Sequence, residues 1–231
     1  MDDHKDFTFV VERERDMTHT DTASRERGFT LIELLVVIAI ITILASLLVP
    51  AVAKTMLKGQ TVGVGNDGRQ VWLGLFTTNL EREQTGKSTV WPKSGDYESS
   101  TAYFRECMKN QWLGEKYTFG VFAAPGLTKA TTIDPLAFSS SNNAWCVVLD
   151  SANLHAESPL MFTRNLFGAG GGGGSLTDVK TFDAGAEPFG DGVGVVITVG
   201  GAVNIIWQDA EAIDLQADFN PLGADNAFIC P

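Results

Sequence analysis

Histidine and cysteine are the side chains of this chain best suited to nucleophilic or metal chemistry, and both are scarce. Of three histidines, only His155 lies outside the polar N-terminal arm. A Ser-His-Asp or Cys-His arrangement would depend on that residue, and no nucleophile-elbow motif accompanies it. The sequence therefore favours a protein that is not an enzyme. The cysteines are Cys107, Cys146 and Cys230, which allow at most one intramolecular disulfide, in any of three pairings.

Carboxylates are abundant, and a group of them lies near the C-terminus. Oxygen-rich loops can bind Ca²⁺, and the candidate ligands are Asp209, Asp214 and Asp218. EF-hand spacing is absent, so a solvated acidic surface is the simpler interpretation and no other cofactor is expected. The whole chain has 28 acidic and 17 basic residues, a formal net charge of −11. Because this charge repels nucleic-acid phosphates, no nucleic-acid partner is expected.

Two glycine-rich stretches could suggest phosphate binding. Gly63, Gly65 and Gly68 spell G-x-G-x-x-G, but a dinucleotide fingerprint needs a preceding strand and a βαβ context. Residues 170–174 are five consecutive glycines followed by Ser175, and the stretch has no lysine for a phosphate-binding loop. We therefore expect a mobile loop there and predict no nucleotide site in either stretch.

A long apolar segment follows the polar N-terminal arm and must position any functional residues near it. Residues 34–53 carry no charged side chain, and as a helix they would span roughly 30 Å, the thickness of a bilayer's hydrocarbon core. Glu33 lies at the start of this apolar region. A carboxylate at membrane depth costs several kcal/mol unless it is paired, which indicates a functional role. Basic residues flank the segment on both sides and orient it only weakly: Arg25, Arg27, Lys54 and Lys58.

The sequence leading into this segment is RGFTLIE, from Arg27 to Glu33. Together with the apolar run it resembles the class III signal of type IV pilins and type II secretion pseudopilins. The resemblance implies cleavage after Gly28 by a membrane-embedded prepilin peptidase and N-methylation of Phe29. Glu33 would then pair with the terminal ammonium of a neighbouring chain. Pro50 matches the helix-kinking proline of the family.

Two other interpretations of the apolar segment stay open. Residues 51–53 fit the A-x-A rule of a secretory signal, which would release a chain beginning at Lys54. The apolar region is long for such a signal, and Glu33 lies within it. An uncleaved signal anchor leaves Glu33 unexplained. The leader is also unusual, because residues 1–28 hold eight acidic and five basic residues, and Met17 offers an alternative start to Met1.

The pattern changes from helical to strand-like near residue 83. Leu57, Val64, Val71 and Leu75 recur at helical spacing, although several glycines predict an interruption of the helix between residues 58 and 69. Beyond it, short apolar runs alternate with turn residues. The strand candidates are residues 117–124, 144–149 and 159–163, and a hairpin of residues 193–199 and 202–207 joined by a two-residue Gly200-Gly201 turn.

The predicted fold class is α+β, with a long N-terminal transmembrane helix packed against a C-terminal antiparallel sheet, as in pilins. The expected parts are a leader (1–28), an assembly helix (29–53), its continuation (54–82) and a β-rich periplasmic domain (83–231). The expected function is a structural subunit of a type II secretion pseudopilus in the bacterial inner membrane. The alternatives are a major or minor type IV pilin and an exported non-pilin protein with a simple signal anchor. Expected partners are copies of the chain and other pseudopilins or pilins, prepilin peptidase, the inner-membrane assembly platform and membrane lipid.

Overall fold

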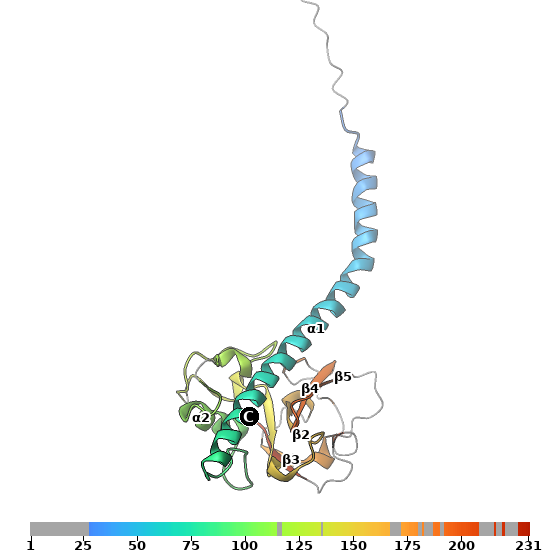
Figure 1. The fold of residues 1–231 in the computed structure, drawn as a ribbon. Helices are drawn as coiled ribbons and strands as arrows, with labels where there is room; N and C mark the ends of the chain where they lie inside the picture. The colour runs from blue at the N-terminus through green and yellow to red at the C-terminus, as the bar shows by residue number, and fades with distance from the viewer. Residues whose placement is uncertain are drawn as a thin grey trace, which may run out of the picture. The chain divides into compact units, whose positions relative to one another are not determined.

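A computed structural model describes residues 28–114, 117–134, 136–166, 172–179, 182, 187–189, 192–207, 215, 219 and 226–231. The chain divides into two compact units, residues 1–48 and 49–231. One helix, α1 (Leu31–Gln84), contributes to both units, and Figure 1 shows the path of its ribbon. The second unit adds α2 (Ser100–Lys109) and a six-stranded antiparallel sheet. The predicted α+β, pilin-like layout is therefore confirmed.

The sheet has the strand order β3-β6-β1-β2-β4-β5. Every pairing is antiparallel, for example Cys146 opposite Phe162 and Val195 opposite Ile205. The C-terminal strand is thus inserted between β3 and β1. The strands are β1 (Trp145–Val148), β2 (Pro159–Thr163), β3 (Gly173–Ser175), β4 (Val193–Thr198), β5 (Val203–Trp207) and β6 (Ala227–Ile229). Short 3-10 helices are Phe119–Phe122, Ser140–Asn142, Ser151–Asn153, Arg164–Leu166 and Leu176–Asp178.

Alternate side chains of β1 and β4 enter two hydrophobic clusters, as the two-residue period of a strand requires. Trp145 and Val147 of β1 join one cluster with Leu75 of α1 and the aromatic residues of α2. Cys146 and Val148 join the other, together with Phe228. Because both faces are covered, β1, β2 and β4 are buried along their whole length. Their sequences are therefore continuous apolar runs without polar alternation.

The predicted interruption of the helix between residues 58 and 69 is wrong, because α1 is continuous there. The glycines instead let the helix approach the sheet closely. A Cβ on Gly68 would lie 2.6 Å from Cη2 of Trp145, and one on Gly65 would lie 2.7 Å from Cγ1 of Val203. Packing of the helix on the sheet offsets the loss of about 1 kcal/mol in helix propensity per glycine. Of the G-x-G-x-x-G pattern, Gly65 and Gly68 therefore serve helix–sheet contact, whereas Gly63 is exposed.

Three strand predictions and one loop prediction can also be compared with the structure. The candidates at residues 144–149 and 159–163 are confirmed as β1 and β2. Residues 117–124 are not a strand, because Phe119–Phe122 is a 3-10 helix whose Phe122 ring packs between those of Phe104 and Phe138. Within residues 170–174, the prediction of a mobile loop is wrong for Gly173 and Gly174, which pair with β6 as part of β3.

The hairpin of β4 and β5 is confirmed, but its predicted two-residue turn is not. Thr198 N donates to the Ala202 carbonyl at 3.0 Å, so the loop contains three residues, Val199, Gly200 and Gly201. Gly201 alone of these has positive φ, +81°. This agrees with three-residue hairpins, in which a single left-handed residue follows a type I turn.

Candidate processing and assembly site

The Gly28–Phe29 peptide bond lies ahead of α1, in a stretch without regular structure. Among the described residues, no atom lies within 4 Å of where a Cβ of Gly28 would be. Phe29 is 78% exposed. The bond predicted to be cut is therefore accessible and is not held in the hydrogen-bond ladder of the helix.

Thr30 and Glu33 cap the beginning of α1 by bonding to each other. The Thr30 backbone N–H donates to Glu33 Oε2 at 2.8 Å, and the Thr30 hydroxyl donates to the same oxygen at 2.7 Å. In return, the Glu33 N–H donates to Thr30 Oγ1 at 3.3 Å. This is a capping box, which satisfies backbone donors that have no partner inside the helix.

Thr30 caps the helix, a role that was not predicted from the sequence. The sequence does contain the pattern for it, because Thr-x-x-Glu before an apolar run is typical of a capping box. The carboxylate of Glu33 is held at the positive end of the helix dipole, where a negative charge is stabilised. Both bonds from Thr30 end on Oε2. A cation that approached Oε1 would therefore not need to displace Thr30, which leaves room for the predicted partner ammonium.

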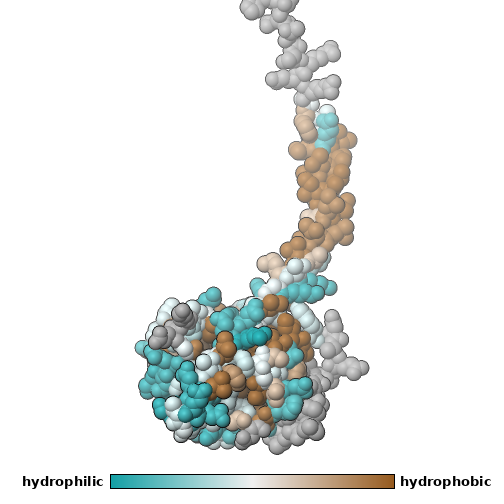
Figure 2. Space-filling view, viewed as in Figure 1, coloured by the Kyte–Doolittle hydropathy of each residue, from teal (hydrophilic) through white to brown (hydrophobic). Residues whose placement is uncertain are grey.

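The first unit presents a hydrophobic surface around its part of α1. From Leu31 to Pro50 every residue is exposed, and the face visible in Figure 2 is almost entirely apolar over this stretch. Two hydroxyls lie within it. Thr42 donates to the Ile38 carbonyl and Ser46 to the Ile43 carbonyl, each at 2.7 Å. Because these groups are satisfied inside the helix, the surface suits lipid or another apolar helix.

Among the described residues, α1 is the one helix long and apolar enough to cross a membrane. Pro50 lies inside it, close to the boundary between the two units. The ring removes one N–H, so the carbonyl four residues earlier, that of Ser46, loses its intrahelical donor. A kink at Pro50 stays a prediction.

In the second unit the structure selects one of the three cysteine pairings. Cys146 of β1 forms a disulfide with Cys230, which follows β6. Cys107, on α2, is free and fully buried. A bridge between Cys107 and Cys146 is therefore excluded. The disulfide ties the last strand to the middle of the sheet, where β6 and β1 are already neighbours.

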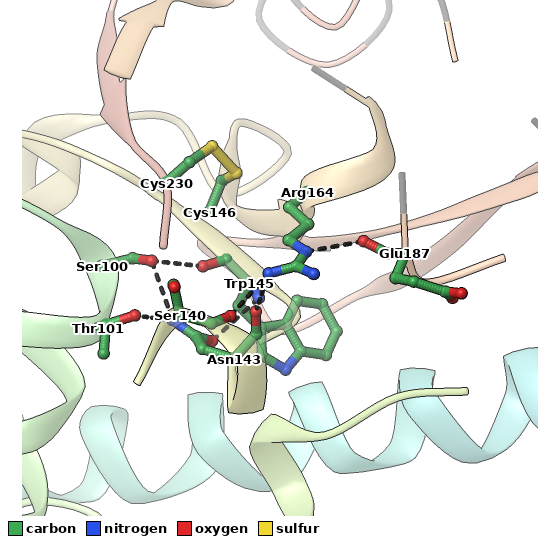
Figure 3. The surroundings of a disulfide bond; sticks show 9 residues. All are labelled: Ser100, Thr101, Ser140, Asn143, Trp145, Cys146, Arg164, Glu187 and Cys230. Atoms are coloured by element: carbon green, nitrogen blue, oxygen red, sulfur yellow. Dashed lines mark hydrogen bonds between the residues drawn. A yellow bond between two sulfur atoms is a disulfide. The ribbon is translucent and has the colours of Figure 1, made fainter. Parts of the chain in front are cut away.

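Beside the disulfide, a buried polar network joins α2 to β1 (Figure 3). Asn143 Nδ2 donates to Ser100 Oγ at 3.0 Å and to Thr101 Oγ1 at 3.3 Å. The Ser100 hydroxyl donates to the Trp145 carbonyl at 2.6 Å, and the Trp145 N–H donates to Asn143 Oδ1 at 3.0 Å. These bonds satisfy backbone groups at the start of β1, so the cluster stabilises the fold.

Arg164 extends this support to the neighbouring loops. Its Nε donates to the Glu187 carbonyl and its Nη1 to the Ser140 carbonyl, both at 2.7 Å. Burial lowers the pKa of Arg164, and the nearby Glu187 carboxylate opposes that shift. The guanidinium of this half-buried arginine thus holds loop carbonyls together, which is a structural role.

The calcium candidates Asp209, Asp214 and Asp218 lie outside the described residues. Within the described ranges, no group of three or more His, Cys, Asp or Glu side chains is placed to hold a metal ion. His155 is exposed, and its Nδ1 accepts a bond from the Glu157 N–H at 3.4 Å. The structure therefore brings together Gly28, Phe29, Thr30 and Glu33 as the candidate functional site, at the start of an exposed apolar helix.

Comparison with known families supports this site. A family model described as the prokaryotic N-terminal methylation motif matches residues 23–49. The match includes Gly28, Phe29 and Glu33, so the chain carries a prepilin-type cleavage and methylation segment. The match does not distinguish pseudopilins from pilins. Searches of curated proteins and of solved structures give no significant match.

Proposed function

We propose that this chain is a structural subunit of a type II secretion pseudopilus, processed after Gly28 and assembled through its N-terminal helix. The observation that carries the proposal is the methylation motif at residues 23–49, placed on a helix that begins with the Thr30–Glu33 capping box. The helix is exposed and apolar for the length of a bilayer. Such a surface needs lipid before assembly and other helices after it.

The proposed location is the inner membrane, with residues 83–231 in the periplasm. The Cys146–Cys230 disulfide supports this location, since disulfides persist in oxidising compartments such as the periplasm. The proposed partners are copies of this chain and related subunits, a prepilin peptidase and an assembly platform in the membrane. The protein acts by assembly, and we propose no cofactor and no reaction of its own.

A type IV pilin is the second candidate, because the same motif serves both machines. The modest soluble domain and the net charge of −11 favour secretion. The two candidates differ in the phenotype of a strain that lacks the gene. Loss of secreted proteins with surface filaments retained supports the pseudopilus, whereas loss of surface filaments supports the pilus.

Processing is tested by N-terminal sequencing of the membrane-bound protein made with a prepilin peptidase. The expected first residue is a methylated Phe29. A bulky residue at position 28, as in Gly28→Leu, should block cleavage, whereas Gly28→Ala should be cut in part because alanine is also small. A mature protein beginning at Lys54 would instead identify an ordinary secretory signal, and an intact precursor a simple anchor.

Assembly is tested with Glu33→Ala. We expect normal membrane insertion and cleavage, because the scissile bond is unchanged and a charge is removed from the apolar segment. Filaments and cross-linked oligomers should be lost, because the partner ammonium no longer finds a carboxylate. Glu81→Ala is the matched control, since Glu81 is an exposed glutamate near the other end of α1. Normal assembly of the Glu33 variant would contradict a role in subunit register.

A further inference from the structure

In the second unit, the β4–β5 hairpin lies alongside α1 in a fixed direction. Near the loop of the hairpin, Trp72 Nε1 donates to the Val199 carbonyl at 2.8 Å. Near the open end, Leu57 Cδ2 lies 3.7 Å from where a Cβ of Gly192 would be. The open end of the hairpin, where β5 finishes with Trp207, therefore lies beside the part of α1 that follows the apolar segment.

Trp207 is half-buried at this open end, and a lysine of α1 lies over it. Lys58 Nζ is 5.9 Å from the centroid of the Trp207 ring, within the range of a cation–π contact. Lys58 is exposed, and so is Lys54, one helical turn earlier. In a chain with net charge −11, two lysines one turn apart on the helix are a local basic feature.

The distance of these residues from the apolar segment can be measured along the helix. The uncharged segment ends at Ala53, and Lys58 is five residues further on. At 1.5 Å per residue this is about 7.5 Å. Each headgroup layer of a bilayer is about 5–8 Å thick. Lys58, with Trp207 beside it, is thus about one headgroup-layer thickness beyond the end of the apolar segment along the helix.

We propose that the open end of the β4–β5 hairpin docks on the membrane surface, with Trp207 among the lipid headgroups and Lys54 and Lys58 on lipid phosphates. The chemistry fits, because tryptophan gathers at membrane interfaces and lysine extends its ammonium toward phosphate. Docking fixes the height and rotation of the soluble domain over the membrane before the subunit is assembled. The inference rests on the proposed function, in which the apolar segment spans a membrane.

The chain offers a matched control at the other end of α1. Arg82 lies 5.8 Å from the centroid of the half-buried Trp112 ring, a second cation–π pair of the same kind. It is 24 residues beyond Lys58, about 36 Å along the helix. A membrane that reaches Trp207 does not reach Trp112. Substitution of each tryptophan by phenylalanine keeps an aromatic ring and removes one fluorophore of five.

The experiment uses the processed full chain in vesicles of phosphatidylcholine and phosphatidylglycerol. Some of the phosphatidylcholine carries bromine, either close to the headgroup or near the end of the acyl chains. We expect shallow bromine to quench up to about a fifth of the tryptophan emission, the share of one tryptophan in five. This quenching should persist in Trp112→Phe and disappear in Trp207→Phe. Deep bromine should quench much less. Disulfide formation and near-UV circular dichroism check that both variants are folded.

The lysines are tested in the same vesicles with Lys54→Gln and Lys58→Gln. Each lysine removed is expected to shift the equilibrium between docked and undocked domains about fivefold toward undocked at an anionic surface. Quenching of Trp207 should fall accordingly, while flotation with the vesicles is unchanged. Lys87→Gln is the control, because Lys87 is an exposed lysine beyond the end of α1.

The outcomes separate this inference from the proposed function. If the chain floats with the vesicles but Trp207→Phe leaves the shallow quenching unchanged, the inference is wrong and membrane anchoring stands. If Trp207 responds only when subunits assemble, its surface contacts another copy, and the lipid assignment is again wrong. If the chain does not float at all, both the anchoring and the docking are overturned.

Discussion

Gly63 and Gly68 lie on different sides of α1, and only Gly63 has room for an added methyl group. Gly63 is exposed, and no described atom lies within 4 Å of its Cβ position. Gly68 is buried, and its Cβ position is 2.6 Å from Cη2 of Trp145 and 2.9 Å from Cγ1 of Ile197. Gly63→Ala should therefore raise the free energy of unfolding by about 0.5–1 kcal/mol, because alanine is the better helix former.

Gly68→Ala brings the same gain in helix propensity but adds a methyl group to a filled space. Trp145 cannot easily move away, because it is fully buried and its Nε1 donates to the Val121 carbonyl at 3.1 Å. Overpacking of this kind costs about 1–3 kcal/mol. Since the propensity gain is common to both variants, the difference between them measures the packing cost alone. Each kcal/mol corresponds to about 2–4 °C in melting temperature for a unit of this size.

The assay is unfolding of the full chain in detergent, followed by tryptophan fluorescence. All five tryptophans lie in the second unit, so the signal reports that unit. Coincident transitions by circular dichroism test two-state behaviour. Gly59→Ala is a second exposed control, with no described atom within 4 Å of its Cβ position. If Gly68→Ala stabilises the protein as much as these controls, the glycine does not serve helix–sheet packing and the reasoning fails.

Three other outcomes are expected in the second unit. Replacing Cys146 and Cys230 by alanine should cost about 2–5 kcal/mol of stability by denaturant titration, because the bridge closes a separation of 84 residues. Burial raises the pKa of the Cys107 thiol, so maleimide should label it, by mass spectrometry, only after unfolding. Burial raises the pKa of Asp67 against the opposing effect of Lys129, so its ionised form opposes folding at neutral pH. Asp67→Asn should therefore stabilise the protein there, and the gain should shrink as the pH falls through the raised native pKa.

Local sequence patterns were enough to predict the strands that are buried on both faces. The candidate at residues 159–163 coincides with β2. A short apolar run bounded by turn residues is typical of a strand that is buried on both faces. The β4–β5 hairpin followed from two β-branched runs around Gly200 and Gly201. The length of its loop could not be predicted from the two glycines. The pairing of Thr198 with Ala202 depends on the hydrogen bonds along both strands of the hairpin.

Features that depend on distant partners could not be predicted in this way. The glycines of α1 cost helix stability locally, and the strand residues that they contact, such as Trp145 and Val203, are far away in sequence. The Cys146–Cys230 pairing likewise depends on the order of strands in the sheet. Of the candidate site, Gly28, Phe29 and Glu33 were predicted from their spacing. Thr30 was missed although its capping pattern is purely local.

The position of β6 imposes an order on the folding of this protein. Strands β3 and β1 are both made earlier than β6, yet each of them pairs with it. As the chain is made from its N-terminus, the edges of β1 and β3 stay open until residues 227–229 follow, and open edges favour wrong pairing. Cys230 follows β6 directly, so its disulfide with Cys146 can form only after β6 has been made. The bridge then holds β6 beside β1, which closes the open edge.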